Sequence, residues 1–416
     1  MTDRVEAAMS AALQHYLPRK DTPIAIGFSG GGDSTALLHA LRDRVEHVHV
    51  FIVDHGLRAG AMQEAQAARF RAQQWGFQAE ILTWKPELLR SGVQEKARHA
   101  RYGLIGDKMR ERAISYLLTG HTEDDQAETC LMRYERSTDW RGAAGMATSV
   151  YAPVWPELAE ITVLRPLLGL SRAALRSYNN RHNLEWAEDP SNQNRKFTRI
   201  RARDNLEQNQ ALRAHLLNAA VDLQAGLSEE RQYLRDWMKR HADVHLNGYI
   251  QLGAIPPSEA LLHLIRAVSG QGDMIDKAKL KSLRRNMAQT GFKGATLGGA
   301  HILKTKQSFI LVCDPAHAKG RRGTHAIAPM VLKQGPQIWD GRFLVHYSGA
   351  DKLMLCPAWG HINRFEGQFS SVPAAARPTL PLVINEAGAC IAFGAHNAQT
   401  LKVKWLGAER LEKTLA

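Results

Sequence analysis

The sequence has few cysteines, and no two of them lie close together. Its 416 residues include four cysteines, none of which forms a C-x-x-C pair. This spacing argues against a disulfide scaffold, a zinc ribbon or an iron–sulfur site, and it is typical of the reducing cytoplasm. The cysteines are Cys130, Cys313, Cys356 and Cys390. We therefore expect a cytoplasmic protein whose fold depends on hydrophobic cores.

Long apolar runs are also absent. No stretch of about 18 consecutive apolar residues occurs, so the sequence predicts no membrane-spanning helix and no membrane partner. The first six residues are too polar for a signal peptide. With 44% hydrophobic residues over this length, the chain can bury the cores of two or three domains.

Acidic residues are outnumbered by basic ones. The sequence has 54 Lys and Arg against 41 Asp and Glu, which gives a net charge of +13 and a pI of about 9.7. Such an excess of positive charge favours a polyanionic partner such as nucleic acid. A generically basic protein is the alternative that charge alone leaves open.

The most informative stretch lies between an expected strand at residues 24–28 and an expected helix at 35–41. It reads Ser29-Gly30-Gly31-Gly32-Asp33-Ser34. The first N–H groups of a helix lack backbone partners and carry the positive end of its dipole. Glycines let an anion approach the backbone, and serine hydroxyls add donors. The stretch therefore predicts a phosphate cradle, with a flexible Gly/Ser turn as the plainer alternative.

This cradle differs from the commonest phosphate loops. It has neither the Gly-Lys-Ser/Thr of a Walker loop nor the G-x-G-x-x-G spacing of a dinucleotide site. A carboxylate, Asp33, stands inside it. Because a carboxylate and a phosphate repel each other unless a cation lies between them, the sequence implies Mg²⁺ at Asp33.

The first half of the chain alternates strands with helices. Strands are expected at residues 24–28, 47–53, 79–84 and 114–119, and helices at 4–16, 35–41, 62–75, 94–112 and from about 122. This order predicts right-handed βαβ units, and hence an α/β domain with a doubly wound parallel sheet. Ligands of such sheets bind beyond the carboxyl ends of the strands.

The pattern changes after about residue 205. We expect helices over 209–246, a helix that opens with Ser258 as its N-cap, a basic helix at 277–285 and a hairpin over 295–313. From about residue 335 the chain is expected to be mostly β. We therefore predict three domains: a catalytic one at 1–208, a helical or mixed one at 209–325 and a small β-rich one at 326–416.

A second motif occupies residues 120–129, Gly-His-Thr-Glu-Asp-Asp-Gln-Ala-Glu-Thr. Thr122 can cap a helix, and acidic residues suit its first turn. Asp125 and Glu128, three residues apart, lie on one helix face and can hold one ammonium group or one metal ion. His121 is more often a core histidine than a catalyst in such a place. Zinc is not expected, because no partner cysteines or histidines are near.

A cluster of cations follows at Arg195, Lys196, Arg199, Arg201 and Arg203. A solvated helix face is the plain interpretation. In a basic protein the cluster also suits phosphate contact, and we expect at least one of these residues to face the active site.

These motifs resemble known enzymes. The hexad at 29–34 matches S-G-G-x-D-S, the PP-loop of the N-type ATP pyrophosphatases, which cleave ATP between its α and β phosphates and adenylate a carbonyl oxygen. Residues 121–129 are similar to the H-x-x-D-D-Q-A-E-T signature of the tRNA-isoleucine lysidine synthetases. Further matches to that family lie at 53–58, 95–102, 165–168 and 186–192, and at the C-terminal segments 339–343 and 380–382.

The resemblance implies an adenine nucleotide alpha hydrolase-like fold and a two-step reaction. The wobble cytidine of an isoleucine tRNA with a CAU anticodon is adenylated at its C2 carbonyl oxygen, and free L-lysine then displaces AMP to give lysidine. The ATP-binding residues that it implies are Ser29, Gly30, Gly31, Gly32, Asp33, Ser34, Asp54 and His55. From pattern alone, residues 54–56 could also be a simple strand-end turn. The resemblance also allows a homodimer.

Roles for catalytic residues come from the same resemblance. Asp33 would hold Mg²⁺, and Arg101 would hold the cytidine or the developing charge. Asp125 and Glu128 would hold lysine. Arg199 would bind the carboxylate of lysine or the adenylated intermediate.

Three alternatives remain open at this point. A tRNA thiolase of the same class would need a sulfur relay, usually paired cysteines. A small-molecule ligase such as an argininosuccinate synthetase would not need the positive charge. A catalytically weak RNA-binding paralogue would not need the intact hexad.

The sequence also departs from the family pattern at two places. Residues 136–139, Arg-Ser-Thr-Asp, replace the usual Arg-Gly-Ser-Gly. Ile200 replaces an Asn that commonly follows the arginine aligned with Arg199. The loss of both glycines restricts the backbone conformations open to the loop at 136–139.

Overall fold

The computed structural model describes residues 3–54, 56, 60–85, 93–136, 139–188, 198–272, 275–320 and 326–416. The chain forms two compact units. The N-terminal unit comprises Met1–Pro153 and Glu160–Glu229, and the C-terminal unit comprises Val154–Ala159 and Glu230–Ala416. The predicted three-domain division, with boundaries at 208 and 325, stays a prediction.

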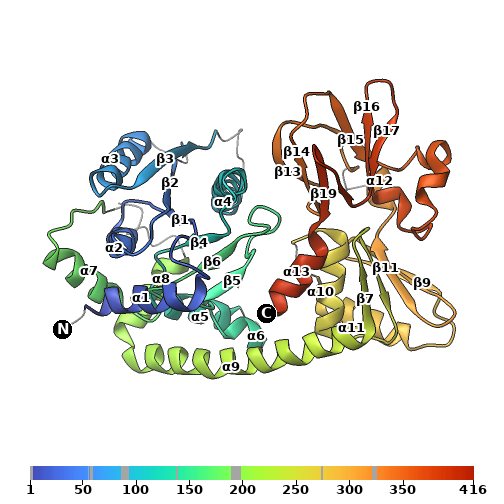
Figure 1. Ribbon diagram of the computed structural model, residues 1–416. Helices are drawn as coiled ribbons and strands as arrows, with labels where there is room; N and C mark the ends of the chain where they lie inside the picture. The colour runs from blue at the N-terminus through green and yellow to red at the C-terminus, as the bar shows by residue number, and fades with distance from the viewer. Residues whose placement is uncertain are drawn as a thin grey trace. The chain divides into compact units, whose positions relative to one another are not determined.

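The N-terminal unit is built around a six-stranded sheet of order β3-β2-β1-β4-β6-β5 (Figure 1). Its strands are β1 (Ile24–Gly27), β2 (Val48–Asp54), β3 (Gln78–Thr83), β4 (Tyr116–Leu118), β5 (Ser149–Tyr151) and β6 (Thr162–Leu164). All neighbours pair in parallel except β5, which runs antiparallel to β6. The doubly wound parallel sheet is confirmed.

Helices connect these strands and cover the sheet. They are α1 (Arg4–Tyr16), α2 (Gly32–Leu41), α3 (Ala61–Gln74), α4 (Val93–Glu111), α5 (Glu123–Glu135), α6 (Trp140–Ala143), α7 (Arg172–Arg181), α8 (Thr198–Gln208) and the start of α9 (Gln210–His241). The apolar residues of β1 are fully buried, and Leu37 and Leu38 of α2 join them in one hydrophobic cluster. This core holds the start of α2 at the carboxyl end of β1.

The sheet has a switch point at β1. Strand β1 pairs with β2 on one side and with β4 on the other, so the chain leaves it in opposite directions. In open α/β sheets, ligands bind in the crevice that such a reversal creates beyond the carboxyl ends of the strands. The glycine-rich loop follows β1, and residues 119–122 follow β4. The fold therefore brings the two motifs to one crevice.

The C-terminal unit contains three antiparallel sheets. One has the order β7-β8-β11-β10-β9, a second β12-β15-β16-β17 and a third β13-β14-β19-β18. The first sheet comprises β7 (Ala242–His245), β8 (Tyr249–Leu252), β9 (Gly294–Leu297), β10 (Ala300–Lys304) and β11 (Phe309–Cys313). The others comprise β12 (Met330–Val331), β13 (Gly335–Trp339), β14 (Phe343–Tyr347), β15 (Leu353–Pro357), β16 (Pro381–Asn385), β17 (Cys390–Phe393), β18 (His396–Asn397) and β19 (Leu401–Trp405).

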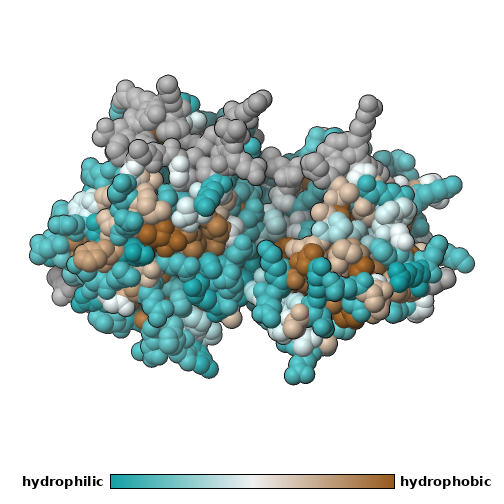
Figure 2. All heavy atoms as spheres, turned by 90° about the horizontal axis from the view of Figure 1, so that it is seen from above, coloured by the Kyte–Doolittle hydropathy of each residue, from teal (hydrophilic) through white to brown (hydrophobic). Residues whose placement is uncertain are grey.

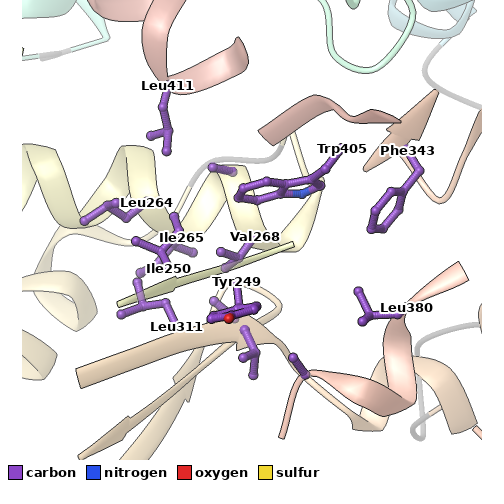
Figure 3. Packing of buried hydrophobic residues seen from close by; sticks show 14 of the residues in the cluster. Tyr249, Ile250, Leu264, Ile265, Val268, Leu311, Phe343, Leu380, Trp405 and Leu411 are labelled. Carbon is purple, nitrogen blue, oxygen red and sulfur yellow. The ribbon is translucent and has the colours of Figure 1, made fainter. Parts of the chain in front are cut away.

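Helices α10 (Ser258–Ser269), α11 (Lys277–Met287), α12 (Ala316–Lys319) and α13 (Leu406–Leu415) complete this unit, with 3₁₀ turns at Ile362–Phe369 and Arg377–Thr379. Its main hydrophobic cluster extends from Ile250 and Leu264 to Phe343 and Trp405 (Figure 3), and a smaller cluster surrounds Phe369. The expected helices and the β-rich end are present. A five-stranded sheet accompanies the helices of the middle region.

Three local expectations were wrong. Residues 242–245 form β7 instead of continuing a helix, because the chain pairs with β8 there. Ser258 is the first residue of α10, whose N-cap is Pro257 and has no side-chain cap. The expected hairpin at 295–313 has three strands, because a turn at Gly298 and Gly299, both with positive φ, adds β9 to the pair.

The surface shown in Figure 2 is mostly hydrophilic in each unit, with hydrophobic side chains in separate patches. In the described part of the chain, no helix has the length and apolar character needed to cross a bilayer.

Candidate active site

The loop after β1 is shaped for an anion. Gly30 has a φ of +77°, which favours glycine, and a Cβ built there would lie 3.2 Å from the Cβ of Ala68. Gly31 is the N-cap of α2 and, as a glycine, has no side chain that could cap this helix. The first N–H groups of α2 are therefore open to an acceptor from outside the chain, which is the arrangement of a phosphate cradle.

Hydroxyl groups brace this loop from within. The Ser34 Oγ donates to the Gly31 carbonyl at 2.9 Å and lies 3.1 Å from the Ser29 Oγ. The Thr35 Oγ1 donates to the Gly30 carbonyl at 3.4 Å. Ser34 is buried, so this loop is less exposed than its polar sequence suggests. These hydrogen bonds within the loop hold its backbone in the cradle conformation.

Asp33 is the carboxylate of the cradle. Its side chain is 28% exposed, and its Oδ2 accepts a long hydrogen bond of 3.4 Å from the Nε of Arg172. Burial raises the pKa of Asp33 to about 6; nearby Asp125 adds to the rise, and Arg172 opposes it. Asp33 is thus an ionised group that lacks sufficient positive charge around it.

This environment fits a bound Mg²⁺. Magnesium is commonly held in proteins by one or two carboxylates together with substrate phosphates and water. Asp33 supplies one such carboxylate at the mouth of the cradle. Among the described residues, no cluster of three or more His, Cys, Asp and Glu side chains could hold a metal ion without such phosphates.

Arg172 is a functional candidate that sequence reasoning missed. It is the first residue of α7, and its backbone N–H donates to the Asp124 Oδ2 at 2.7 Å. Its guanidinium contacts Asp33, donates to the Asp125 Oδ1 at 2.8 Å and lies 3.7 Å from the Glu128 Oε1. The side chain therefore links the cradle to α5. The only sequence signal for Arg172 is its position shortly after the family-like segment at 165–168.

Asp125 accepts hydrogen bonds from two groups of Thr122 and from two arginines. Its Oδ2 accepts from the N–H and the Oγ1 of Thr122, at 2.8 and 2.9 Å, in a capping box. Its Oδ1 accepts from Arg172 at 2.8 Å and from Arg199 at 2.9 Å. Burial alone would raise the pKa of Asp125, but Arg199 and Arg172 outweigh it and hold that pKa below its ordinary value.

Glu128 lies deeper in the same network. Its side chain is 2% exposed. The Oε2 accepts from the Arg199 Nε at 2.6 Å, and the Oε1 accepts from the Arg203 Nε at 2.8 Å. Because Arg199 and Arg203 are four residues apart on α8, both reach the same face of α5. The structure thus brings Asp125, Glu128 and Arg199 together, and the ligand-binding roles assigned to them stay predictions.

The complete network holds equal numbers of opposite charges. Three guanidiniums, those of Arg172, Arg199 and Arg203, face three carboxylates, those of Asp33, Asp125 and Glu128. Buried charges need this degree of pairing, because removal of one partner leaves the other charge buried with neither a counter-charge nor water around it. Of these arginines, Arg199 has the most exposed side chain, at 46%.

His121 lies at the end of β4 beside this network. Its Nδ1 is 2.9 Å from the Thr119 Oγ1. Burial, followed by the nearby Arg165, lowers the pKa of His121 to about 4. The imidazole is therefore neutral at physiological pH. Its neighbour Gly120 fits closely against the cradle, since a Cβ there would lie 3.1 Å from the backbone of Asp33 and Ser34.

Arg101 and Asp54 occupy more peripheral positions. Arg101 is an exposed residue of α4, and no hydrogen bond or ion pair is found for it within the described chain. Asp54 is buried at the end of β2, where its Oδ1 accepts from the Gly56 N–H at 2.9 Å. His55 and residues 189–197, which include Arg195 and Lys196, lie outside the described residues.

Hydrogen bonds stabilise the chain at Asp139 and after it, where the sequence departs from the family pattern. Asp139 caps α6, with its Oδ1 accepting from the Gly142 N–H at 3.2 Å. The loop after α6 is held by the Arg133 guanidinium, which donates to the carbonyls of Gly142 and Gly145, and by a reciprocal pair of bonds between Gln126 and Met146. Ile200 is buried in α8.

A small pocket borders Glu128. It has a volume of about 220 Å³, and its polar lining includes Asp124, Glu128, Ser171, Arg203, Glu207 and Arg213. A larger hollow of about 1230 Å³ lies at the amino ends of the strands, next to the first residues of β2 and β3, and shares no residue with the cradle. The smaller pocket is therefore the one relevant to the site.

Comparison with known proteins gives a consistent result. Residues 1–210 match the PP-loop domain family. The tRNA(Ile)-lysidine synthase of Hyphomonas neptunium is 34% identical over 324 residues, which cover 74% of this chain and 86% of the relative. That of Caulobacter vibrioides is 30% identical over 395 residues, which cover 92% and 88%. Among solved structures, the U34-tRNA thiolase NcsA from Methanococcus maripaludis has a TM-score of 0.44 at 17% identity, over 53% of this chain and 78% of that one.

The matches to these relatives cover most of this chain and most of each relative. The PP-loop family match at residues 1–210 includes the cradle and the acidic helix α5. The chain belongs to the tRNA(Ile)-lysidine synthase family of PP-loop enzymes.

Proposed function

We propose that this enzyme joins free L-lysine to C2 of the wobble cytidine in an isoleucine tRNA with a CAU anticodon. The observation that carries the proposal is the linkage of a phosphate cradle to a buried acidic pair through Arg172, within a chain of this family. The products would be lysidine in the tRNA, AMP and pyrophosphate.

The cradle would bind the triphosphate of ATP through the open N-terminus of α2. Asp33 would hold Mg²⁺, which supplies charge neutralisation at the phosphates. The C2 carbonyl oxygen of cytidine attacks the α-phosphorus, and pyrophosphate leaves with the electrons of the broken P–O bond. The lysine ε-amine then attacks C2, and the C2–O bond breaks to release AMP. Adenylation is needed because AMP is a far better leaving group than a carbonyl oxygen.

The acidic pair would receive lysine by exchange of ion pairs. Both oxygens of Glu128 are bound to arginines in this structure, so an incoming ammonium group must replace one guanidinium. Arg199 suits this exchange because it has the most exposed side chain of the three arginines. Once displaced, it could bind the lysine carboxylate. The exchange leaves the number of ion pairs unchanged, which limits its cost.

The pocket beside Glu128 supports the same assignment. It contains carboxylates for an ammonium group and guanidiniums for a carboxylate, which is the pattern that a free zwitterionic amino acid requires. Arg101 would contact the cytidine, since it is exposed on α4 and has no partner in the described chain.

Base thiolation receives less support. A thiolase needs a reactive sulfur near the cradle, and Cys130 is the only cysteine of the N-terminal unit. It is buried among Ala127, Leu131 and Ala202, and burial raises the pKa of its thiol. A buried thiol of raised pKa is a poor nucleophile.

Further parts of the proposal concern assembly. Residues 209–416 would supply most of the tRNA affinity, through lysine and arginine contacts to phosphates. A homodimer and a cytoplasmic location stay predictions, which sedimentation of the full chain and cell fractionation would test.

The decisive experiment is mass spectrometry of tRNA after incubation with enzyme, ATP, Mg²⁺ and isotopically labelled lysine. The labelled mass should appear in a nucleoside from the anticodon of the CAU isoleucine tRNA and be absent when ATP is omitted. A transcript with its wobble cytidine replaced by uridine is the matched control. Incorporation of sulfur, or of no label at all, would contradict the proposal.

A further inference from the structure

A second group of cations lies beside the ion network, and it has no counter-charge. Arg98 and Arg101 lie on α4, and Arg165 directly follows β6. Within the described chain, none of the three forms an ion pair with a carboxylate. Arg98 packs over the ring of Tyr102, with its Cζ 5.0 Å from the ring centre. That contact positions the guanidinium without neutralising it.

Arg165 is the most informative of these residues. It is only 8% exposed. Its Nη1 donates to the Ala147 carbonyl at 2.6 Å, whereas its Nε is buried and finds no hydrogen-bond acceptor among the described residues. A buried N–H donor without an acceptor destabilises the folded protein, because the N–H group has lost its hydrogen bond to water and makes no other. Such a group is expected where an anion arrives with the substrate.

The position of Arg165 separates this group from the phosphate cradle. Strand β6 pairs with β4, which in turn pairs with β1. Because neighbouring strands lie about 4.8 Å apart, the end of β6 is roughly 10 Å from the end of β1. His121, at the end of the strand between them, is close enough to both Arg165 and Arg98 for each to lower its pKa. Arg165 therefore lies two strands from the triphosphate cradle, and Arg98 lies near the same histidine.

We propose that Arg165, together with Arg98 and Arg101, forms a second phosphate subsite that is distinct from the PP-loop. Three unpaired cations suit a phosphate better than the single charge of an amino-acid carboxylate. Its position beyond the reach of the cradle favours a backbone phosphate next to the cytidine. The pyrophosphate released from ATP offers the same chemistry. This inference rests on the proposed function for the identity of the RNA.

Three single variants test the subsite. Arg165→Lys keeps the buried charge, but a lysine cannot both bond the Ala147 carbonyl and present a fixed second donor to phosphate. Arg98→Gln removes an exposed charge and leaves the core intact. The control is Arg176→Gln, which removes an exposed charge from α7 in the same unit. Thermal unfolding of each variant checks that the fold is retained.

Two titrations distinguish the sources of phosphate. One measures the binding of an anticodon stem-loop RNA over a series of salt concentrations, without ATP. The other measures ATP and pyrophosphate binding without RNA. If the subsite binds the RNA backbone, Arg165→Lys and Arg98→Gln should weaken RNA binding by roughly ten- to a hundredfold. The slope of log affinity against log salt should also fall by about 0.7 for each lost contact with single-stranded RNA.

The remaining outcomes are also decisive. Loss of pyrophosphate affinity with unchanged RNA affinity would keep the subsite and assign it to the leaving group. If neither affinity changes relative to Arg176→Gln, Arg165 only holds the loop at Ala147, and the inference is wrong. Because both titrations measure binding, they remain informative even if the wild-type enzyme fails to incorporate lysine, which would overturn the proposed function alone.

Discussion

Replacement of Asp33 by Asn should stabilise the ligand-free protein while it abolishes turnover. The carboxylate of Asp33 is largely buried, close to Asp125, and its contact with Arg172 is long. An amide of the same shape removes the charge and leaves Arg172 bonded to Asp125. The variant should therefore keep the fold, gain stability and lose Mg²⁺-dependent ATP cleavage.

The magnitude follows from the pKa. The pKa of Asp33 rises from 3.8 to about 6 in the folded state. At about 1.36 kcal/mol per pKa unit, the ionised group costs the folded state about 3 kcal/mol at neutral pH. This figure is an upper value, since relaxation around the group and residual solvent reduce the cost. We expect a measured gain of about 1–3 kcal/mol for Asp33→Asn at pH 7.

The sign of the pH dependence makes the test specific. Above about pH 6 the carboxylate is ionised in both states, and the full cost is present. As the pH falls from about 6 to 3.8, the folded wild type takes up a proton first and recovers stability. The advantage of Asp33→Asn should therefore shrink across that range and vanish below it.

Urea unfolding at several pH values between 4 and 8 gives the required free energies. Asp125→Asn is the matched comparison, because the pKa of Asp125 is lowered by Arg199 and Arg172 in spite of its burial. It should lose stability at pH 7. A loss of stability in Asp33→Asn, or a gain that does not change with pH, would refute the reasoning. Normal ATP turnover in that variant would refute the metal-binding role.

Three more predictions concern the site and the RNA. In Asp125→Asn and Glu128→Gln, the lysine requirement should rise about ten- to a hundredfold, at about 1.5–3 kcal/mol per charge-assisted bond. If tRNA-dependent pyrophosphate release falls as much as lysine incorporation does, these carboxylates serve the nucleotide instead. Gly120→Ala should raise the KM for ATP and lower stability by about 1–3 kcal/mol, because the new Cβ meets the backbone of the cradle at 3.1 Å. Gly169→Ala, where no atom lies within 4 Å, is its control. Neutralising four of the five exposed cations of α11 should weaken tRNA binding and its salt dependence more than it slows saturated turnover, and an unchanged titration would show that this helix is only a solvated face. Those cations are Lys279, Lys281, Arg284 and Arg285.

The sequence predicts much of the N-terminal unit because its signals are local. Alternating apolar strands and amphipathic helices follow from periodicity, and α1 covers the expected residues 4–16. Thr122 caps α5 as predicted, because an N-cap depends on residues only three positions away. The same holds for the open glycine turn before α2.

What the sequence does not reveal depends on long-range contacts. Arg172 is an ordinary residue in its own segment, and its role arises only because α7 begins beside Asp33 and α5. The pairing of Glu128 with Arg199 and Arg203 joins residues more than 70 positions apart. The helical period found earlier in the segment 209–246 extends the expected helix over the residues of β7, and pairing with β8 makes them a strand instead. The fold gathers Asp125, Glu128 and Arg199, but the roles assigned to them stay predictions, and their other partners were visible only in three dimensions.

The shared ion network also limits which fragments of this enzyme can be transplanted onto another scaffold. One carboxylate, Asp125, caps its own helix and at the same time bonds side chains from two other helices. A graft of the glycine-rich loop onto another α/β scaffold would carry the cradle without the guanidinium that connects it to the acidic pair. Protein engineers who want to redirect this chemistry should therefore transplant α2, α5, α7 and α8 together, because no smaller fragment contains a charge-balanced site.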